Sequence, residues 1–198
     1  MARPITYDRE AVVAVAARKF WEKGFDGCDL DMLTRASGLN RHSLYKSFGG
    51  KNGLFLDALR LYVESIADEY VTALEGSDGL EAIVRYFELV AGATNDVMGY
   101  DRRGCLVTNT IIEMGRSNEA VSGVIDQYYA RVERAFAEAI RCGQQEGTIR
   151  KSLDPQAMAH WLRLTGQGLS VSARNGATPP DLAKIVRTAL AEQRCAAA

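Results

Sequence analysis

The stretch SGLNRHSLYKSFGGKNGLF, residues 37–55, decides the fold of this chain. It places a short polar segment between two breaks, Gly-Leu-Asn and Gly-Gly. At about 100° per residue, Leu44 and Phe48 fall on one side of a helix, where they can pack inward with Leu33 and Leu39. A helix this short is stabilised by packing rather than by its own propensity. We therefore expect a small anchored helix that projects a polar face outward.

The segments before this stretch complete a helix-turn-helix. One helix is predicted between Asp8, as its N-terminal cap, and Gly24; a second is predicted over residues 30–37, behind Asp29 as its cap. Gly38 suits the left-handed turn that ends the second helix. In such a motif the last helix enters the DNA major groove while the preceding one braces it. Residues 1–52 are therefore predicted to form a DNA-binding domain.

The polar face of the opening stretch has the chemistry that DNA requires. Cationic side chains reach phosphates or guanine edges, while hydroxyl and imidazole groups hydrogen-bond to base edges or phosphates. A lysine that opens the next helix also lies where the helix dipole favours an anion. The candidate DNA-binding residues are Arg41, His42, Ser43, Tyr45, Lys46 and Lys51. An ordinary solvated surface is the alternative for such a helix taken alone.

Helical periodicity continues to the C-terminus, and no segment alternates as a strand does. We predict an all-α fold of about nine helices, in which a long helix from Lys51 to about Glu75 connects two domains. Residues 53–198 form the second, larger domain. Its further helices are predicted near residues 78–94, 104–115, 119–146, 155–175 and 180–194. The 119–146 segment carries the clearest apolar stripe.

Composition excludes several classes of function. The net charge is −1, but residues 1–60 carry ten Lys/Arg and seven Asp/Glu, so any anionic partner belongs to that part. The four cysteines are widely spaced and the two histidines are isolated, which argues against a disulfide framework or a metal site. No catalytic motif, cofactor motif, signal peptide or membrane span is found. We expect a reduced, cytoplasmic protein that is not an enzyme and holds no cofactor.

The run ARKFWEKGFDGCDLDMLTRASGLNRHSLYKSFGGKNGLFLDAL, residues 17–59, resembles the N-terminal domain of TetR/AcrR-type repressors. The resemblance rests on its Phe-x-x-x-Gly-Phe, Ala-Ser-Gly-Leu, Leu-Tyr-x-x-Phe and Lys-x-x-Leu motifs. It implies a homodimeric repressor that binds a palindromic double-stranded DNA operator and releases it when a small molecule occupies the C-terminal domain. The six candidate residues fall at family positions that meet DNA. Cys28 and Thr34 stand where the family usually has Thr and Ala, so no phosphate contact is expected from position 28.

The C-terminal helices predict a dimer interface and a ligand pocket. Gly166 and Gly168 permit close backbone approach in a helix that, with the last one, forms either an interface or part of the monomer's core. Among residues 78–175, apolar walls with a few polar groups predict a small-molecule site. Its candidate residues, each of which can also be plain core, are Tyr86, Phe87, Cys105, Asn109, Tyr128 and Trp161.

Cys105 follows Arg102, Arg103 and Gly104 at the predicted start of a helix, where cations and the helix dipole favour a thiolate. Some regulators of the resembled family sense electrophiles or oxidants through a cysteine in a similar context. Two alternatives to a ligand-released repressor therefore stay open. One is a thiol-based sensor that acts through Cys105, in contrast to an inert buried cysteine. The other is an architectural DNA-binding protein without an effector.

Overall fold

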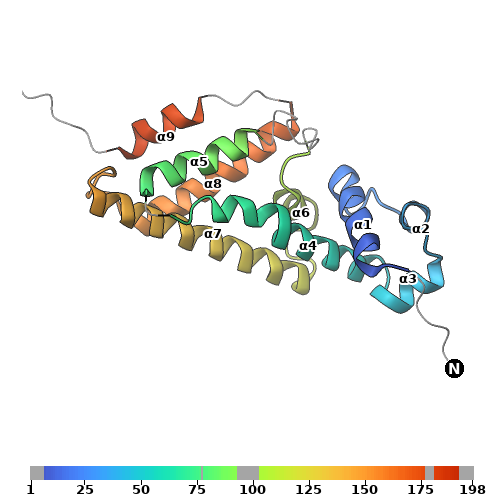
Figure 1. Ribbon diagram of the computed structural model, residues 1–198. Coiled ribbons are helices and arrows are strands. Elements are labelled where there is room, and N and C mark those ends of the chain that lie inside the picture. Colours follow the sequence, from blue (N-terminus) through green and yellow to red (C-terminus); the bar gives the residue numbers. More distant parts are fainter. Residues whose placement is uncertain (1–6, 77, 93–102, 177–180, 192–198) are drawn as a thin grey trace, which may run out of the picture.

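The computed structural model describes residues 7–76, 78–92, 103–176 and 181–191. Over these ranges the chain forms nine α-helices and no strand, which confirms the predicted all-α fold (Figure 1). An isolated bridge joins Ile149 to Ala191. The helices are α1 (Arg9–Lys23), α2 (Leu30–Ser37), α3 (Arg41–Phe48), α4 (Lys51–Thr72), α5 (Gly79–Gly92), α6 (Leu106–Met114), α7 (Glu119–Glu146), α8 (Pro155–Arg174) and α9 (Leu182–Leu190).

Side-chain caps begin each of the first three helices. The carboxylate of Asp8 accepts hydrogen bonds from the first backbone N–H groups of α1, and Asp29 accepts one from Met32 at 2.6 Å. Asn40 does the same for α3, where its side-chain oxygen accepts from the Ser43 N–H at 2.8 Å. Gly38 ends α2 in the left-handed conformation at φ 71°. Local chemistry therefore fixes the boundaries of the short helices.

The small domain has a core of its own. Leu33, Leu39, Leu44 and Phe48 are buried, as the spacing of apolar residues predicts. Cys28 is fully buried beside them, and burial raises the pKa of its thiol. Position 28 therefore lies inside the small domain and away from its DNA-facing surface.

Arg9 fastens the start of α1 to two other helices. Its guanidinium donates to the backbone oxygen of Ser47 at 2.9 Å and pairs with Asp57 of α4. The same group lies 4.4 Å from the centre of the Phe48 ring. A single side chain thus ties the recognition helix to the long helix that follows it.

The long helix α4 belongs to both domains. Its first turns pack into the small core, where Phe55 meets Phe20 edge-on with ring centroids 4.9 Å apart. Its later residues Ala67 and Val71 are buried where α4 packs on α7. Figure 1 shows α4 running from the group formed by α1–α3 into the larger bundle. The boundary between residues 52 and 53 falls in the first turn of α4 and stays a prediction.

Helices α5–α9 form the larger bundle around α7. The predicted apolar stripe of α7 is largely buried, and Phe136 lies within it at 0% exposure. At the crossing of α5 and α7, a Cβ added to Gly79 would lie 2.2 Å from the backbone oxygen of Ala139. Only glycine permits this approach. The Gly79 N–H in turn donates to the Glu146 carboxylate at 3.2 Å.

Candidate DNA interface and internal pocket

Helix α3 presents the predicted polar face to solvent. The side chains of Arg41, His42, Tyr45 and Lys46 are exposed, while Ser43 is half-buried. Leu44 and Phe48 occupy the opposite side of the helix, as noted for the small core. The structure thus brings the α3 candidates together on one surface, and Figure 1 places α3, with α1 and α2, at the end of the molecule opposite the larger bundle.

Two members of this face have intramolecular partners. The Arg41 guanidinium donates from Nε and Nη2 to Asp31 of α2, at 3.1 and 2.8 Å. Asp31 raises the pKa of Arg41, and both side chains stay exposed. The ring of Tyr45 lies over Gly50, where an added Cβ would come within 2.9 Å of Cε1. Gly50 has φ 96°, a conformation that favours glycine and turns the chain. Its missing side chain also leaves the space that the Tyr45 ring occupies.

Lys51 opens α4 beside α3. Gly50, the N-terminal cap of α4, provides no side-chain hydrogen bond to the first turn. The ammonium of Lys51 lies 4.2 Å from the centre of the Phe25 ring, which holds it near the α1–α2 turn. Lys51 is half-buried, unlike Lys46. Its position adjoins the polar face of α3 without being part of it.

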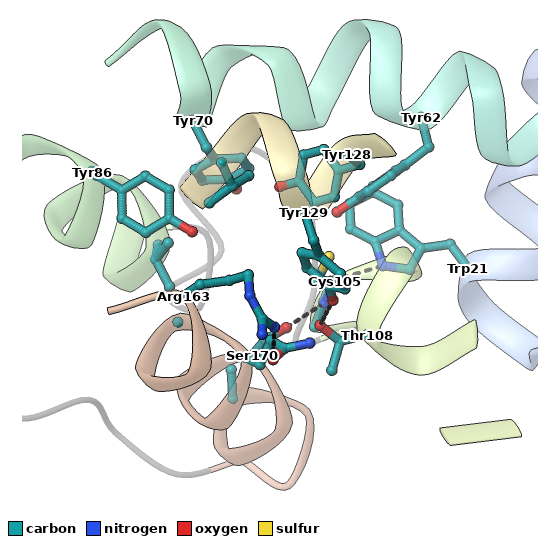
Figure 2. Close-up of a pocket in the computed structure, with 16 residues that line it drawn as sticks. Trp21, Tyr62, Tyr70, Tyr86, Cys105, Thr108, Tyr128, Tyr129, Arg163 and Ser170 are labelled. Atoms are coloured by element: carbon teal, nitrogen blue, oxygen red, sulfur yellow. Dashed lines mark hydrogen bonds between the residues drawn. The ribbon is translucent and has the colours of Figure 1, made fainter. Parts of the chain in front are cut away.

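A cavity with an interior volume of about 60 Å³ lies where α4, α5, α6, α7 and α8 meet the end of α1. Tyrosines dominate its walls, and Figure 2 shows their rings arranged around the interior. It is lined by Trp21, Tyr62, Tyr70, Tyr86, Val90, Gly104, Cys105, Thr108, Tyr128, Tyr129, Val132, Arg163, Gly166, Gln167, Ser170 and Ala173.

Three of the six predicted ligand residues line this cavity, and three do not. Tyr86, Cys105 and Tyr128 are among the lining residues. Phe87 instead packs fully buried against Phe136. The Asn109 side chain donates to the backbone oxygen of Arg103 at 2.9 Å, at the base of α6. Trp161 is 46% exposed on the outer face of α8, so its expected place in the pocket is wrong.

Sequence reasoning missed most of the tyrosine wall. Five of the chain's eight tyrosines line the cavity, including Tyr62, Tyr70 and Tyr129. They come from α4, α5 and α7, so no local spacing connects them. Their abundance in a chain with only six phenylalanines was the available signal. Gly166, which the sequence assigns to a helix of either an interface or the core, faces this cavity: an added Cβ would lie 3.1 Å from the Tyr86 hydroxyl.

Cys105 caps the start of α6 at the edge of the cavity. Its backbone N–H donates to the Ser170 hydroxyl at 2.6 Å, and its side chain is half-buried. Burial raises the pKa of the Tyr62 hydroxyl, and the neighbouring Cys105 thiol raises it further. Arg103 lies over the Trp21 ring and 3.7 Å from Glu22, while Arg102 lies outside the described residues. The expected placement of Cys105 at a helix start is confirmed.

Helix α6 contacts the small domain at both of its ends. Before its first turn, the backbone oxygen of Gly104 accepts a hydrogen bond from Trp21 Nε1 at 2.8 Å. Near its last turn, the two carboxylate oxygens of Glu113 accept from the backbone N–H groups of Phe25 and Asp26, each at 2.7 Å. Since Trp21 also lines the cavity, the pocket wall includes a residue of the small domain.

The described residues contain no helix that is long and apolar enough to cross a membrane. Within the same ranges, no three His, Cys, Asp or Glu side chains gather as metal ligands do. A helix-turn-helix with an exposed polar helix, joined by α4 to a bundle with an internal pocket, has the organisation of a DNA-binding transcriptional regulator.

Family comparisons agree with this organisation. The model for "Bacterial regulatory proteins, tetR family" matches residues 12–58, and that for "Tetracyclin repressor-like, C-terminal domain" matches residues 79–191. The chain belongs to the TetR family of DNA-binding transcriptional regulators.

Relatives resemble the chain over nearly its whole length. The HTH-type transcriptional repressor ComR of Escherichia coli is 28% identical over 192 residues, which cover 95% of this chain and 90% of ComR. The transcriptional regulator AcuR of Cereibacter sphaeroides is 28% identical, with 90% and 82% covered. A cysteine mutant of the TetR-family regulator CifR, solved with 26-bp operator DNA, superposes with a TM-score of 0.76 at 28% identity, covering 95% and 97%.

Removing the Glu113 carboxylate tests the contact between α6 and the small domain. In Glu113→Ala, we expect the Phe25 and Asp26 amides to exchange with solvent about tenfold faster, because a hydrogen bond to a charged acceptor contributes about 1.5–3 kcal/mol. Hydrogen–deuterium exchange measures this rate. Glu119→Ala, which removes an exposed carboxylate from α7, is the control. Unchanged protection of both amides in Glu113→Ala would show that the contact does not persist in solution.

Proposed function

We propose that this protein is a homodimeric repressor whose α3 reads a palindromic operator and whose cavity binds a small molecule that releases the operator. The observation that carries this proposal is the position of Trp21, which belongs to the DNA-binding domain and also forms part of the cavity wall. A molecule that enters the cavity contacts the DNA-binding domain directly. We infer that the protein acts in the cytoplasm, because a repressor must reach its operator on the chromosome.

On DNA, the polar residues of α3 divide into two roles. His42 and Ser43 lie near the start of the helix, where such residues meet base edges. Tyr45 and Lys46 lie further along, where a hydroxyl and an ammonium reach phosphates. Arg41 joins them when it exchanges its carboxylate partner Asp31 for a DNA acceptor. Lys51 contributes a further phosphate contact at the start of α4.

Dimerisation is assigned to an exposed apolar stripe on α8. Trp161, Leu164 and Val171 are each 43–47% exposed and follow one side of the helix. Gly168 lies among them, and a Cβ there would meet nothing within 4 Å in this chain. On α9, Ile185 is exposed to a similar extent. An apolar stripe with a glycine at its middle suits the close two-fold packing of identical helices.

Release of the operator follows from the two contacts of α6. Cys105 and Thr108 line the cavity on α6, and Glu113 on the same helix holds the α1–α2 turn. A ligand that prefers one position of α6 therefore also prefers one position of the small domain. By linkage, the operator and the ligand weaken each other's binding when they prefer different positions.

Selection from a random duplex library tests operator reading. The wild-type protein is expected to enrich a palindrome whose half-sites lie about 34 Å apart, the spacing that two recognition helices of a dimer require. The Tyr45→Ala, Lys46→Ala variant should enrich no palindrome at the same salt concentration. Lys151→Ala, which removes an exposed lysine from the α7–α8 connection, should select the wild-type sequence. If the wild type enriches nothing at low salt, the face of α3 is ordinary surface.

A charge in the α8 stripe tests the dimer. Leu164→Asp should sediment as a monomer, because the new carboxylate would be buried without a partner in the interface. Ile112→Asp is the matched control, since Ile112 is 68% exposed on α6, away from the stripe. Analytical ultracentrifugation distinguishes the two outcomes. A Leu164→Asp dimer as stable as the wild type would assign dimerisation to another surface.

A thiol sensor is a second candidate, favoured by the position of Cys105 on the cavity wall. Modification of its sulfur would fill the space that a reversible ligand uses. The thiols of Cys28 and Cys142 are less suited to react. Burial raises the pKa of Cys28, and a hydrogen bond to Glu146 raises the pKa of Cys142. An architectural DNA binder, by contrast, requires no cavity next to its DNA-binding domain.

Limiting iodoacetamide followed by mass spectrometry tests the sensor. In this reaction the thiolate sulfur displaces iodide and forms a carbon–sulfur bond. Cys105 should be alkylated several-fold faster than Cys28, Cys142 and Cys195, and the alkylated protein should lose its operator. A Cys105→Ser protein treated in the same way should keep the operator. Alkylation of Cys105 no faster than the others would rule this candidate out.

A further inference from the structure

Two tyrosines of the cavity wall have hydroxyl groups that open onto the cavity and have no partner among the described residues. Tyr86 and Tyr128 are each only 7% exposed and line the cavity, and Figure 2 shows both hydroxyls directed into it. Neither hydroxyl forms a hydrogen bond with any residue that the structure describes. Burial raises the pKa of both groups, so they stay protonated at neutral pH and act as donors. A hydroxyl that faces the cavity without an acceptor from the protein can donate to an acceptor supplied by a ligand.

The other polar groups of the wall already have partners within the chain. Tyr62 lies near Cys105, which raises the pKa of its hydroxyl, Tyr129 lies 3.4 Å from the Thr108 hydroxyl, and Ser170 accepts from the backbone of Cys105. These contacts hold α4, α6, α7 and α8 together around the cavity. The hydroxyls of Tyr86 and Tyr128 are therefore the donors available to a ligand.

The cavity offers no free charge to a ligand. No carboxylate is among them, and their one cation, Arg163, pairs through Nε with Glu133 at 2.5 Å. Arg163 also donates from Nη1 to Gln167 at 2.6 Å and lies over the Tyr129 ring. A charged ligand would lose its hydration here without meeting a free counter-charge. Six of the sixteen lining residues are aromatic, which favours a flat apolar body.

We propose that the cavity selects a small uncharged molecule with an apolar body and a carbonyl-type oxygen, which accepts hydrogen bonds from Tyr86 and Tyr128. The assignment rests on the proposed ligand-binding function of the cavity and names the chemistry of its ligand. Gly166 belongs to the same site, because a methyl group there would come within 3.1 Å of the Tyr86 hydroxyl. Glycine at this position leaves the hydroxyl free to turn toward a ligand.

Three probes of similar size separate the chemical classes. Acetophenone carries the carbonyl on an apolar ring, ethylbenzene lacks the oxygen, and benzoate adds a negative charge. Titration calorimetry with the full-length wild-type protein should show acetophenone binding at least threefold more tightly than ethylbenzene, and benzoate binding more weakly than acetophenone. Equal affinities for acetophenone and ethylbenzene, tighter binding of benzoate, or no binding of acetophenone would each overturn the assignment.

Single-atom variants then locate the donors. Tyr86→Phe and Tyr128→Phe should each weaken acetophenone binding by about three- to tenfold, the effect of one net hydrogen bond, and leave ethylbenzene binding unchanged. Tyr7→Phe, which removes a hydroxyl outside the cavity, should change neither. Gly166→Ala should weaken acetophenone binding as Tyr86→Phe does, without deleting the hydroxyl. Wild-type acetophenone affinity in both phenylalanine variants would overturn the proposal.

The operator selection described above distinguishes failure of this assignment from failure of the proposed function. Circular dichroism and operator affinity are measured on every variant, so a variant that does not fold is recognised. If the wild type selects an operator but the tyrosine hydroxyls do not affect acetophenone binding, only the ligand class is wrong. If the wild type selects no operator, the regulatory function itself is wrong, whatever the probes bind.

Discussion

The arrangement of this molecule depends on the burial of one indole at the joint between its two parts. Trp21 leaves α1 of the DNA-binding domain, is 6% exposed, and donates its N–H to the backbone oxygen of Gly104. Its ring meets Tyr62 of α4 edge-on, with centroids 5.1 Å apart. An indole N–H in an apolar setting needs an acceptor, and the segment before α6 supplies one. The orientation of α1 and the position of α6 are therefore set together.

As a consequence, two series of contacts connect the cavity to the DNA-binding domain. From Trp21, α1 leads back to Arg9, which holds the end of α3 through Ser47 and pairs with Asp57 of α4. A second connection runs from the cavity along α6 to Glu113 and the α1–α2 turn. Both connections are short and consist of charged or hydrogen-bonded groups with defined directions.

The sequence predicted what local chemistry determines. Asp8, Asp29 and Gly38 act on neighbouring residues, so the start and end of the first helices follow from the sequence nearly residue by residue. Only three of the sixteen residues that line the cavity were predicted, because its walls come from six helices and the spacing within one helix does not show which side faces it. Trp161 has the same apolar character as Trp21, yet it lies outside. Glu113 lies 88 positions from Phe25 and 87 positions from Asp26 in the sequence, so no local pattern indicates their contact.

Charge explains why the distance between the two DNA-binding domains, or heads, matters in the proposed dimer. The recognition helix carries only Arg41 and Lys46 as full cations, and Arg41 is shared with Asp31. Few phosphate contacts per head mean modest affinity for one half-site. Tight binding then requires both heads to engage at once, since the first contact raises the effective concentration of the second. That gain is lost when the geometry forbids simultaneous engagement. A small ligand at the Trp21 joint therefore needs to change only the spacing of the heads, without blocking either DNA-binding surface.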